Sequence, residues 1–387
     1  MAAVRVTGLE TFLVHPGGGK GKNWLFVKVL TDAGVHGWGE AYTQLDRDRA
    51  IEIFAQEMGR YLVGRDPFAI KHFTHTMYHD FVGKRGSVDF FSALSAIEQA
   101  LWDVVGKALG TPVYNLLGGP CRDRIRVYAN GWSGGAKTPA ELVERAREVL
   151  AMGFDALKWD PFPDPWRAYI GPDEERAAVE SVRAMREALG PDVELLVEVH
   201  RRLAPMYAVR IARQIEQYRP FWYEEPVSAQ NLDALAEVRR QIAIPVVTGE
   251  ELYTKSDFRQ VFEKRAVDII NPDVCNVGGI LELKEIAAMA EPSYVAVSPH
   301  NYNSTTIGLA ATVQASAVMP NFLITEYFVN FEAVGKEIAR PPLLPERGSI
   351  PLPTTPGLGI ELDEEALRAR AYLPFPARTL RRVSDEP

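Results

Sequence analysis

Three short apolar runs, each ending at or beside a glutamate, decide the fold of this chain: Glu194-Leu-Leu-Val-Glu-Val-His200, Phe221-Trp-Tyr-Glu-Glu-Pro226 and Pro245-Val-Val-Thr-Gly-Glu250. Each run has the length and composition of a buried strand, and residues with helical periodicity lie between the runs. Short apolar strands that alternate with helices are typical of βα units around a parallel sheet. The three runs therefore predict an α/β fold.

The same alternation extends in both directions from this stretch, beginning near Arg124. Eight strands are expected, over residues 125–129, 156–159, 194–199, 221–223, 245–248, 268–270, 295–297 and 322–325. Helical patterns separate them, for example over residues 139–152, 173–189, 206–218, 231–242 and 280–290. Eight βα units are the number that closes a barrel. We therefore predict a (β/α)8-type barrel over residues 123–339.

The residues before the barrel follow a different, α+β pattern. A strand is expected over residues 4–14, a hairpin over 24–30 and 35–41, and helices over 48–61, 67–79 and 90–109. After the barrel, the segment 340–387 is rich in proline and glycine, which favours an irregular path. We predict an N-terminal α+β domain over residues 1–122, and we expect segment 340–387 to run back and complete it.

Composition and charge argue against several classes of function. The 387 residues carry a formal net charge of −8 without basic clusters, so nucleic acid is not expected as a partner. No apolar stretch has the length of a membrane span, and the first ten residues lack the pattern of a signal peptide. The two cysteines, Cys121 and Cys275, are too few for a disulfide framework. We therefore expect a cytoplasmic protein that does not bind membranes.

Three carboxylates recur at a regular interval: Glu198, Glu224 and Glu250 are 26 residues apart, and each ends a predicted strand. The active site of a barrel lies at the C-terminal ends of its strands, so the three side chains should meet there. Unpaired carboxylates this close together would repel one another, and a divalent cation with oxygen ligands removes that cost. Magnesium (Mg2+) suits this ligand set. The alternative, three surface glutamates on loops, leaves the regular spacing unexplained.

Two histidines are candidates for acid–base chemistry. His200 lies two residues after Glu198, and alternate residues of a strand point to the same side, so it should face the same site. Asp273 and His300 end neighbouring strands, where a carboxylate can fix the tautomer of an imidazole and raise its basicity. For His200 the alternative is a hydrogen-bonded structural histidine.

Two further strand ends carry charged residues, Lys158 and Glu326. They are either catalytic groups or partners in structural ion pairs. A base beside a divalent cation suits removal of the weakly acidic proton next to a carboxylate, because the cation stabilises the charge that moves onto the carboxylate oxygens. A Lys or His base with magnesium is the arrangement known for enolase-type sites.

The chain resembles the enolase superfamily, specifically its mandelate-racemase-like branch, over nearly its whole length. The motifs that carry the resemblance are Pro112-Val-Tyr-Asn-Leu-Leu-Gly-Gly119, Glu224-Glu-Pro226, Gly249-Glu250, Asn271-Pro-Asp273 and Pro356-Gly-Leu-Gly359. The resemblance implies an N-terminal capping domain, metal ligands at Glu198, Glu224 and Glu250, and a catalytic dyad of Asp273 and His300. It also implies that Glu326 binds the substrate carboxylate, and that the protein is a homo-oligomer.

The chain departs from this branch at the second and third strands. Lys158-Trp-Asp160 replaces a Lys-x-Lys pattern, so the second lysine base is missing, and Glu198 stands where aspartate is common. His200, two residues after that ligand, resembles the histidine with which acid-sugar dehydratases protonate the departing hydroxyl. A poor leaving group needs such an acid. We therefore predict a magnesium-dependent hydro-lyase that converts a small sugar acid to a 2-keto-3-deoxy acid.

Specificity is assigned to the capping domain and to the second strand end. The candidate substrate contacts are Trp24, Arg85 beside Lys84, Asp160, and the loop over residues 17–23. Solvated surface loops are the alternative for each of the capping-domain positions. Two other reactions use the same site residues: racemisation or epimerisation, and cycloisomerisation of a sugar lactone. A barrel that binds a ligand without catalysis would be expected to lack a ligand or a base, and none is lacking here.

Overall fold

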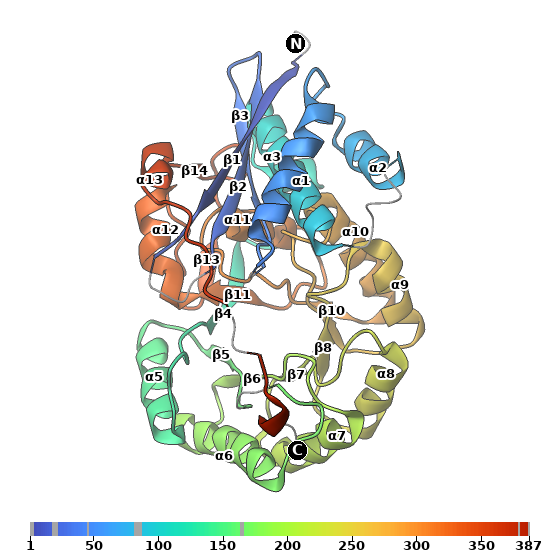
Figure 1. Cartoon of the computed structure of the whole chain (residues 1–387), viewed down its shortest axis with the longest axis vertical. Coiled ribbons are helices and arrows are strands. Elements are labelled where there is room, and N and C mark those ends of the chain that lie inside the picture. Colours follow the sequence, from blue (N-terminus) through green and yellow to red (C-terminus); the bar gives the residue numbers. More distant parts are fainter. Residues whose placement is uncertain are drawn as a thin grey trace.

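A three-stranded antiparallel sheet forms the N-terminal part of the molecule, with strands β1 (Val6–Val14), β2 (Trp24–Thr31) and β3 (His36–Ala41) in sequence order. The computed structural model describes residues 4–17, 22–44, 46–80, 87–162, 166–377 and 380–385. Helices α1 (Asp48–Leu62) and α3 (Val88–Leu109) lie beside the sheet, and α2 (Ile70–Asp80) packs on α3 (Figure 1). The strand–hairpin–helix pattern predicted for this part is present, with α2 beginning at Ile70.

Two glycines allow α3 to lie directly on β3. A Cβ atom at Gly39 would be 1.8 Å from the carbonyl oxygen of Ala96, and one at Gly37 would be 2.1 Å from that of Ala100. No side chain larger than hydrogen fits at such a distance, because it would overlap the helix backbone. The small residues therefore set the close packing that holds the three strands against the longest helix.

A ring of parallel strands forms the second part of the molecule. Its strands are β4 (Arg124–Asn130), β5 (Ala156–Trp159), β6 (Glu194–Glu198), β7 (Trp222–Glu224), β8 (Val246–Thr248), β9 (Ile269–Ile270), β10 (Ala296–Val297) and β11 (Thr325–Phe328). They pair in sequence order, and β11 returns to β4. The amide of Val297 donates to Asn321 O and the amide of Leu323 donates to Val297 O, which joins β10 to the segment before β11.

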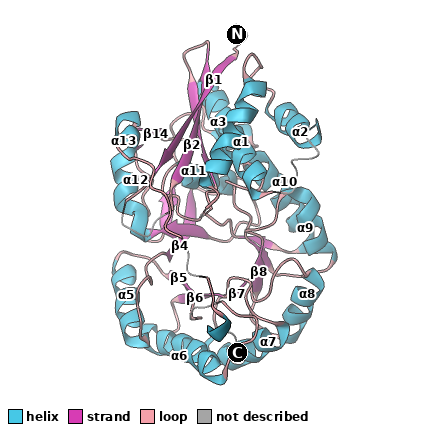
Figure 2. Ribbon diagram, viewed as in Figure 1, coloured by secondary structure: helices cyan, strands magenta, loops and turns pink. Residues whose placement is uncertain are grey.

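Helices follow the strands and form the outer layer around them (Figure 2). They are α5 (Pro139–Ala151), α6 (Pro172–Leu189), α7 (Pro205–Ile215), α8 (Leu232–Gln241), α9 (Thr254–Glu263), α10 (Ile280–Ala290) and α11 (Ile307–Ala317). The short helix α4 (Val113–Leu116) precedes β4, and 3-10 turns η2 (Glu216–Tyr218) and η3 (Glu291–Ser293) follow α7 and α10. The predicted α/β barrel with an N-terminal α+β domain is confirmed.

The eighth strand is the clearest difference from the sequence-based prediction. It was expected over residues 322–325, but β11 runs from Thr325 to Phe328, and Phe322 makes only an isolated bridge to Val297. In the apolar run before Thr325, Phe322 and Leu323 are half-buried and only Ile324 is buried, and the run makes a bridge and single hydrogen bonds with β10 rather than a continuous ladder. An apolar run alone does not fix where pairing begins. Glu326 therefore lies within a strand, opposite Tyr128 of β4.

The C-terminal segment returns to the N-terminal sheet. It contains η4 (Val329–Phe331), α12 (Glu332–Ile338), β12 (Ala339–Arg340), β13 (Ser349–Pro351), β14 (Glu361–Leu362), α13 (Glu364–Arg368) and η5 (Val383–Asp385). Strand β13 pairs with β4, whereas α13 packs on β1, and Glu364 forms an ion pair with Lys28 of β2. The domain boundaries at residues 122 and 340 remain predictions.

Two buried glutamates join the N-terminal part to the barrel. Glu40 of β3 accepts hydrogen bonds from the amide of Gly308, at 2.7 Å, and from the hydroxyl of Ser304, at 2.8 Å, at the start of α11. Glu98 of α3 accepts from the amides of Ile280, at 2.7 Å, and Leu281, at 2.9 Å, at the start of α10. These carboxylates satisfy helix amides that have no partner within their own helices.

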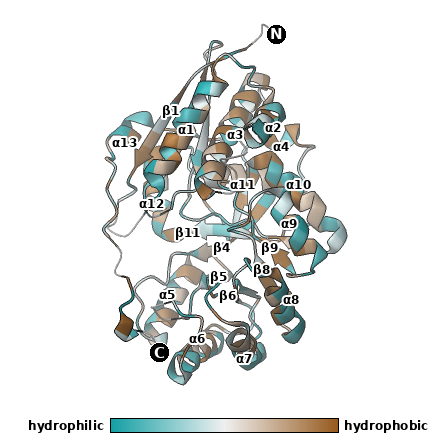
Figure 3. Cartoon of the chain, turned by 45° about the vertical axis from the view of Figure 1, so that its right-hand side comes forward, coloured by the Kyte–Doolittle hydropathy of each residue, from teal (hydrophilic) through white to brown (hydrophobic). Residues whose placement is uncertain are grey.

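Figure 3 shows that the helices carry both apolar and polar residues. Within the described ranges, no helix is both long and apolar enough to cross a membrane. Cys121 is exposed, Cys275 is buried, and both are free thiols.

Candidate active site

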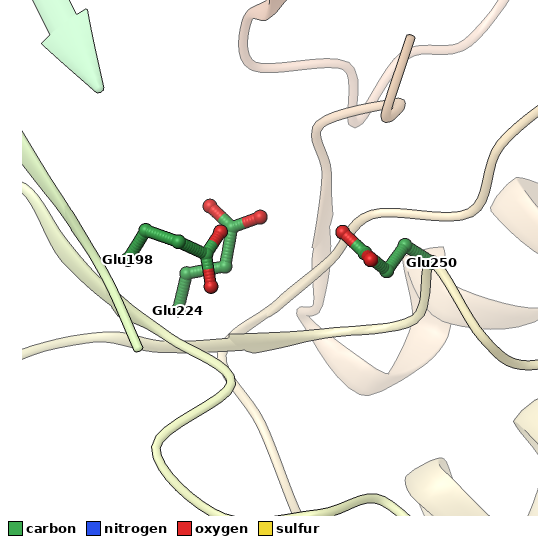
Figure 4. A group of neighbouring side chains, drawn as sticks. All are labelled: Glu198, Glu224 and Glu250. Atoms are coloured by element: carbon green, nitrogen blue, oxygen red, sulfur yellow. The ribbon is translucent and has the colours of Figure 1, made fainter. Parts of the chain in front are cut away.

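The three predicted metal ligands come together at the C-terminal ends of adjacent strands. Glu198 ends β6, Glu224 ends β7 opposite it, and Glu250 follows β8. One carboxylate oxygen from each lies within 4.8 Å of the others, and all three side chains are buried. Glu198 and Glu224 lie side by side, and Glu250 points toward them from across the site (Figure 4).

Protein donors hold these carboxylates in place. Glu224 Oε1 accepts from Lys158 Nζ at 3.0 Å and from Asn271 Nδ2 at 2.8 Å, and its Oε2 accepts from the Trp222 indole at 2.9 Å. Glu198 Oε1 accepts from the amide of His200 at 2.6 Å. Burial and, as the next largest cause, repulsion from Glu198 raise the pKa of Glu224 well above its usual range.

The charges around this cluster fit a divalent cation. Glu326 is a fourth buried carboxylate, 2.9 Å from Lys158 Nζ, which also lies 3.6 Å from Glu198. Lys158 thus pairs with three of the four buried carboxylates, and Arg201 pairs with the fourth, Glu250. Oxygen ligands with an excess of negative charge are what a hard divalent cation requires. The residues present thus fit a metal of this kind.

Lys158 and Glu326 are ion-paired with each other, and Lys158 also pairs with the cluster. The sequence left two interpretations open for them, catalytic groups or partners in structural ion pairs, and these contacts agree with the second. Carboxylates of Glu224 and Glu326 raise the pKa of Lys158 well above its usual range, although burial lowers it. Burial raises the pKa of Glu326, but Lys158 and His300 bring it down to about 2. Glu326 also accepts from Asn130 Nδ2 at 2.7 Å. Both side chains are therefore fixed by ion pairs at the edge of the metal-ligand cluster.

Asp273 and His300 form a buried carboxylate–imidazole pair. His300 Nδ1 lies 2.7 Å from Asp273 Oδ2, and the two residues form a parallel bridge that extends β9 and β10. His300 Nε2 lies 3.2 Å from Glu250 Oε2 and 3.4 Å from Glu326 Oε2, so this nitrogen faces the carboxylate cluster. Burial lowers the pKa of His300, but Glu250 and Glu326 raise it to about 9. A cation bound by Glu250 would offset that effect.

A second carboxylate–imidazole pair lies on the other side of the cluster. His200 Nδ1 is 2.7 Å from Asp160 Oδ2, which also accepts a hydrogen bond from Arg202. His200 has a positive φ of 53° and lies 4.0 Å from Glu198 Oε1. Burial lowers the pKa of His200, but the Glu198 and Asp160 carboxylates raise it. The metal-ligand cluster thus separates two imidazoles, each held by its own aspartate.

The predicted substrate contacts have different positions. Trp24 is 2% exposed and packs on Phe26 and Phe331, so its ring lies in the core. Asp160 contacts His200, as described above. Lys84 and Arg85 lie outside the described residues.

Several residues at the site were not named by sequence reasoning, or were named only as part of a loop. Lys22, in the predicted loop over residues 17–23, is buried, with Nζ 3.5 Å from the ring centre of Tyr302 and 4.4 Å from that of Tyr42. Tyr302 in turn stacks on His300, with ring centres 6.0 Å apart. Burial lowers the pKa of Lys22 to about 7. A lysine in a glycine-rich loop carries no signal that its side chain is buried.

Arginines that directly follow His200 also belong to the site. Arg201 forms ion pairs with Glu225 at 3.0 Å, with Glu251 at 3.2 Å and with Glu250. A cavity of about 470 Å³ opens beside Glu250, between Tyr42 of the N-terminal part and the loops after β7 and β8. The sequence offered one signal for these arginines, which is that they directly follow His200. That signal does not tell which carboxylates the arginines contact.

Comparison with known families agrees with this fold and site. Residues 141–366 match the enolase C-terminal domain-like family, and residues 17–118 match the mandelate racemase / muconate lactonizing enzyme N-terminal domain. The chain therefore belongs to the enolase superfamily, in its mandelate racemase/muconate lactonizing enzyme branch, and the resemblance found in the sequence is confirmed.

Within that branch, the chain is similar to enzymes named as dehydratases. It is 38% identical to a D-gluconate dehydratase of Thermoproteus tenax, over 89% of this chain and 69% of the relative. It is 36% identical to a D-galactonate dehydratase of Variovorax paradoxus (strain S110), over 94% of each chain. The crystal structure of a putative dehydratase from Mesorhizobium loti superposes with a TM-score of 0.90 at 36% identity, covering 95% of this chain and 99% of that one.

Proposed function

We propose that the protein is a magnesium-dependent acid-sugar dehydratase that forms a 2-keto-3-deoxy acid. The relatives named D-gluconate and D-galactonate dehydratase, which align with most of this chain, make it a hydro-lyase acting on sugar acids. The observation that carries the finer proposal is the pair of aspartate-held imidazoles on the two sides of the Glu198, Glu224 and Glu250 cluster. Elimination of water needs a base for the C2 proton and an acid for the C3 hydroxyl.

In this proposal the three glutamates hold magnesium. Bound there, magnesium would supply positive charge to the substrate carboxylate and stabilise negative charge that develops on its oxygens. Lys158, ion-paired with Glu224 and Glu326, adds a second fixed positive charge beside the same position. Glu326 is proposed to hydrogen-bond the substrate carboxylate, which requires one proton shared between these two acids.

His300 is the proposed base. Asp273 accepts the Nδ1 proton, so Nε2, which faces the cluster, carries the free lone pair that removes the C2 proton. The His300 side chain is 4% exposed, which keeps water away from the proton transfer. The electrons of the C2–H bond then move toward the carboxylate, next to Lys158.

His200 is the proposed acid. Its Nδ1 is held by Asp160, so Nε2 is the nitrogen that can donate to the C3 hydroxyl. As the C3–O bond breaks, the hydroxyl leaves as water with the His200 proton, and a C2–C3 double bond forms. The resulting enol becomes a 2-keto-3-deoxy acid when C3 takes up a proton.

The placement of His200 and His300 on two sides of one cluster also suits racemisation or epimerisation, where one imidazole removes the C2 proton and the other returns it. Cycloisomerisation of a sugar lactone is the other reaction that would use the same residues. The missing second lysine at Asp160 and the dehydratase-named relatives favour elimination. Homo-oligomer formation and the cytoplasmic location remain predictions.

The test is to incubate the purified chain with magnesium and a panel of mono- and diacid sugars in D2O. We expect a 2-keto-3-deoxy product from at least one acid, measured by a colorimetric keto-acid assay and by NMR. Deuterium at C2 of an acid without loss of water would support racemisation or cycloisomerisation instead. A panel with neither product nor exchange would contradict the proposal.

A further inference from the structure

We propose that Asp160, anchored by Arg202, is a positioning residue for the elimination step: it holds His200 so that Nε2 is presented to the leaving hydroxyl. This inference rests on the proposed dehydratase function, and it gives Asp160 a role other than direct contact with the substrate. It is carried by the hydrogen bonds of one carboxylate, the packing of the imidazole and the backbone conformation of His200.

Both oxygens of Asp160 are already used within the protein. Oδ1 accepts from the amide of Phe162 at 2.8 Å. Oδ2 accepts from His200 Nδ1 at 2.7 Å and from the Arg202 guanidinium. Two donors on Oδ2 and one backbone donor on Oδ1 fix the plane of the carboxylate. The group is therefore oriented toward the imidazole before any substrate binds.

Arg202 ties Asp160 to two segments of backbone. Its Nε donates to Val199 O at 2.8 Å, and its Nη1 donates to Phe162 O at 3.2 Å. The Arg202 side chain is 3% exposed. A planar guanidinium with three acceptors in fixed places cannot turn without breaking these bonds. The end of β6 and the loop after β5 are thereby held together around the aspartate.

The ring of His200 is also restrained from its face. Trp166 stacks on it, with ring centres 5.2 Å apart and an angle of 23° between the planes, and the Arg202 guanidinium lies 4.7 Å from the Trp166 ring. Stacking limits tilt of the imidazole, whereas the bond from Nδ1 to Asp160 limits its rotation. The two contacts together determine where Nε2 points.

The backbone at His200 explains why such support is needed. His200 and Arg201 have positive φ values of 53° and 55°, a conformation that is unfavourable for residues with a side chain. The amide of His200 donates to Glu198 Oε1, and the amide of Arg201 donates to Glu225 O. This turn takes His200 away from the strand direction, so its orientation depends on the residues around the ring.

The chemical consequence separates the two halves of the reaction. Removal and return of the C2 proton need only His300, because the C2–H bond breaks toward its Nε2 and re-forms from it. Loss of water needs a proton from His200 as the C3–O bond breaks. A misplaced His200 should therefore leave proton exchange at C2 intact and slow elimination.

The experiment compares Asp160→Asn with the wild type, both loaded with magnesium, in D2O with a turned-over acid. The amide has one oxygen for donors that lie on two positions. With the oxygen at the Oδ1 position the NH2 group faces both His200 Nδ1 and Arg202, and with the oxygen at the Oδ2 position it faces the amide of Phe162, so either orientation sets donor against donor and weakens the hold on His200. We expect kcat for elimination to fall by about 100-fold, with KM changed by less than about 3-fold. Deuterium should accumulate at C2 of the unreacted acid, which a merely structural defect would not produce.

Asp173→Asn is the matched control, since it makes the same substitution at an aspartate of α6 whose side chain is 89% exposed, and it should keep full activity. Equal loss of exchange and elimination in Asp160→Asn would overturn the proposal, as would a raised KM with unchanged kcat, the result expected for a substrate contact.

An activity-independent readout separates this proposal from the proposed function. The proton on His200 Nδ1 should give a downfield NMR signal that is lost in Asp160→Asn and His200→Asn and kept in Asp173→Asn. If the wild type dehydrates no acid but this signal behaves as expected, the function fails while the positioning of His200 by Asp160 holds. If the signal is unchanged in Asp160→Asn, the positioning role fails even in an active dehydratase.

Discussion

The two carboxylate–imidazole pairs, Asp273–His300 and Asp160–His200, have the same distance of 2.7 Å from Nδ1 to Oδ2 but different surroundings. The His300 side chain is 4% exposed, whereas that of His200 is 34% exposed. A base that removes a weakly acidic C–H proton works best where water is excluded. An acid that releases a hydroxyl as water needs a path for that water. The same local pairing is thus placed in two environments that suit opposite tasks.

Their neighbouring charges differ as well. His300 Nε2 faces two carboxylates, Glu250 and Glu326, which favour a proton on the ring. Asp160 shares its Oδ2 between His200 and Arg202, whose guanidinium lies 3.4 Å from His200 Nδ1. Near His200 the carboxylates of Glu198 and Asp160 also favour a proton on the ring, but the Arg202 charge opposes them. The pairs therefore differ in the charges around the imidazole, although their geometry is alike.

The largest expected effect comes from removing the enclosed imidazole. His300→Asn should lose both dehydration and C2 exchange by at least about 10³-fold, because His300 Nε2 is the proposed base for the C2 proton. Its magnesium affinity, measured by calorimetry, should stay within a few-fold of the wild type. The exposed His72 on α2 offers the control His72→Asn, which should be fully active. Full activity of His300→Asn would show that the base is elsewhere.

Removing the more exposed imidazole should separate the two steps. His200→Asn is expected to slow dehydration by about 10²–10³-fold and to keep C2 exchange, because His300 and the metal-ligand cluster remain. Deuterium content at C2, followed by NMR alongside keto-acid formation, measures both steps in one sample. Loss of exchange together with dehydration would mean that His200 is not confined to the acid step.

A change in the cluster between the pairs should affect both of them. Glu224→Gln removes one negative charge from the proposed ligands, and we expect magnesium affinity to fall by about 100-fold, with activity restored in part at high magnesium. Calorimetric titration and activity against magnesium concentration check this. Glu251→Gln, at a half-exposed glutamate outside the cluster, is the control. Unchanged affinity in Glu224→Gln would contradict the ligand assignment.

The smallest expected effect is on stability and concerns Glu98, a buried carboxylate that accepts hydrogen bonds from amides at the start of α10 and does not contact either imidazole pair. Burial raises the pKa of Glu98 from 4.5 to about 7. A carboxyl whose pKa is higher in the folded state contributes stability below pH 4.5, and this contribution is lost as pH rises through 7. A pKa shift of this size corresponds to a change of about 3 kcal/mol in the free energy of unfolding across this pH range.

Melting temperatures at pH 5 and pH 8 test this shift. The decrease from pH 5 to pH 8 should be smaller in Glu98→Gln than in the wild type, although the variant melts lower at both because it loses one acceptor for a helix amide. Glu144→Gln, on the exposed face of α5, is the control. An equal decrease in the wild type and in Glu98→Gln would show that Glu98 does not titrate in this range.

Much of the architecture followed from local pattern. Apolar runs alternating with helices predicted the barrel, and the interval of 26 residues predicted that Glu198, Glu224 and Glu250 would meet. Strand and helix spacing are local properties, and in a barrel they fix which end of the sheet each residue occupies. The eighth strand was misplaced by three residues because its pairing depends on β4 and β10, which are distant in sequence.

The sequence by itself determined the fold class, the enolase-type motifs and the residue types at the strand ends. Only the tertiary structure decided the pairing of charges: Asp160 with His200, Arg202 with Asp160, and Lys22 over Tyr302 beside His300. The physical reason is that hydrogen bonds and ion pairs depend on distances of a few ångströms. At His200 those distances follow from a turn with positive φ, and at Lys22 from contact between two parts of the chain separated by about 280 residues.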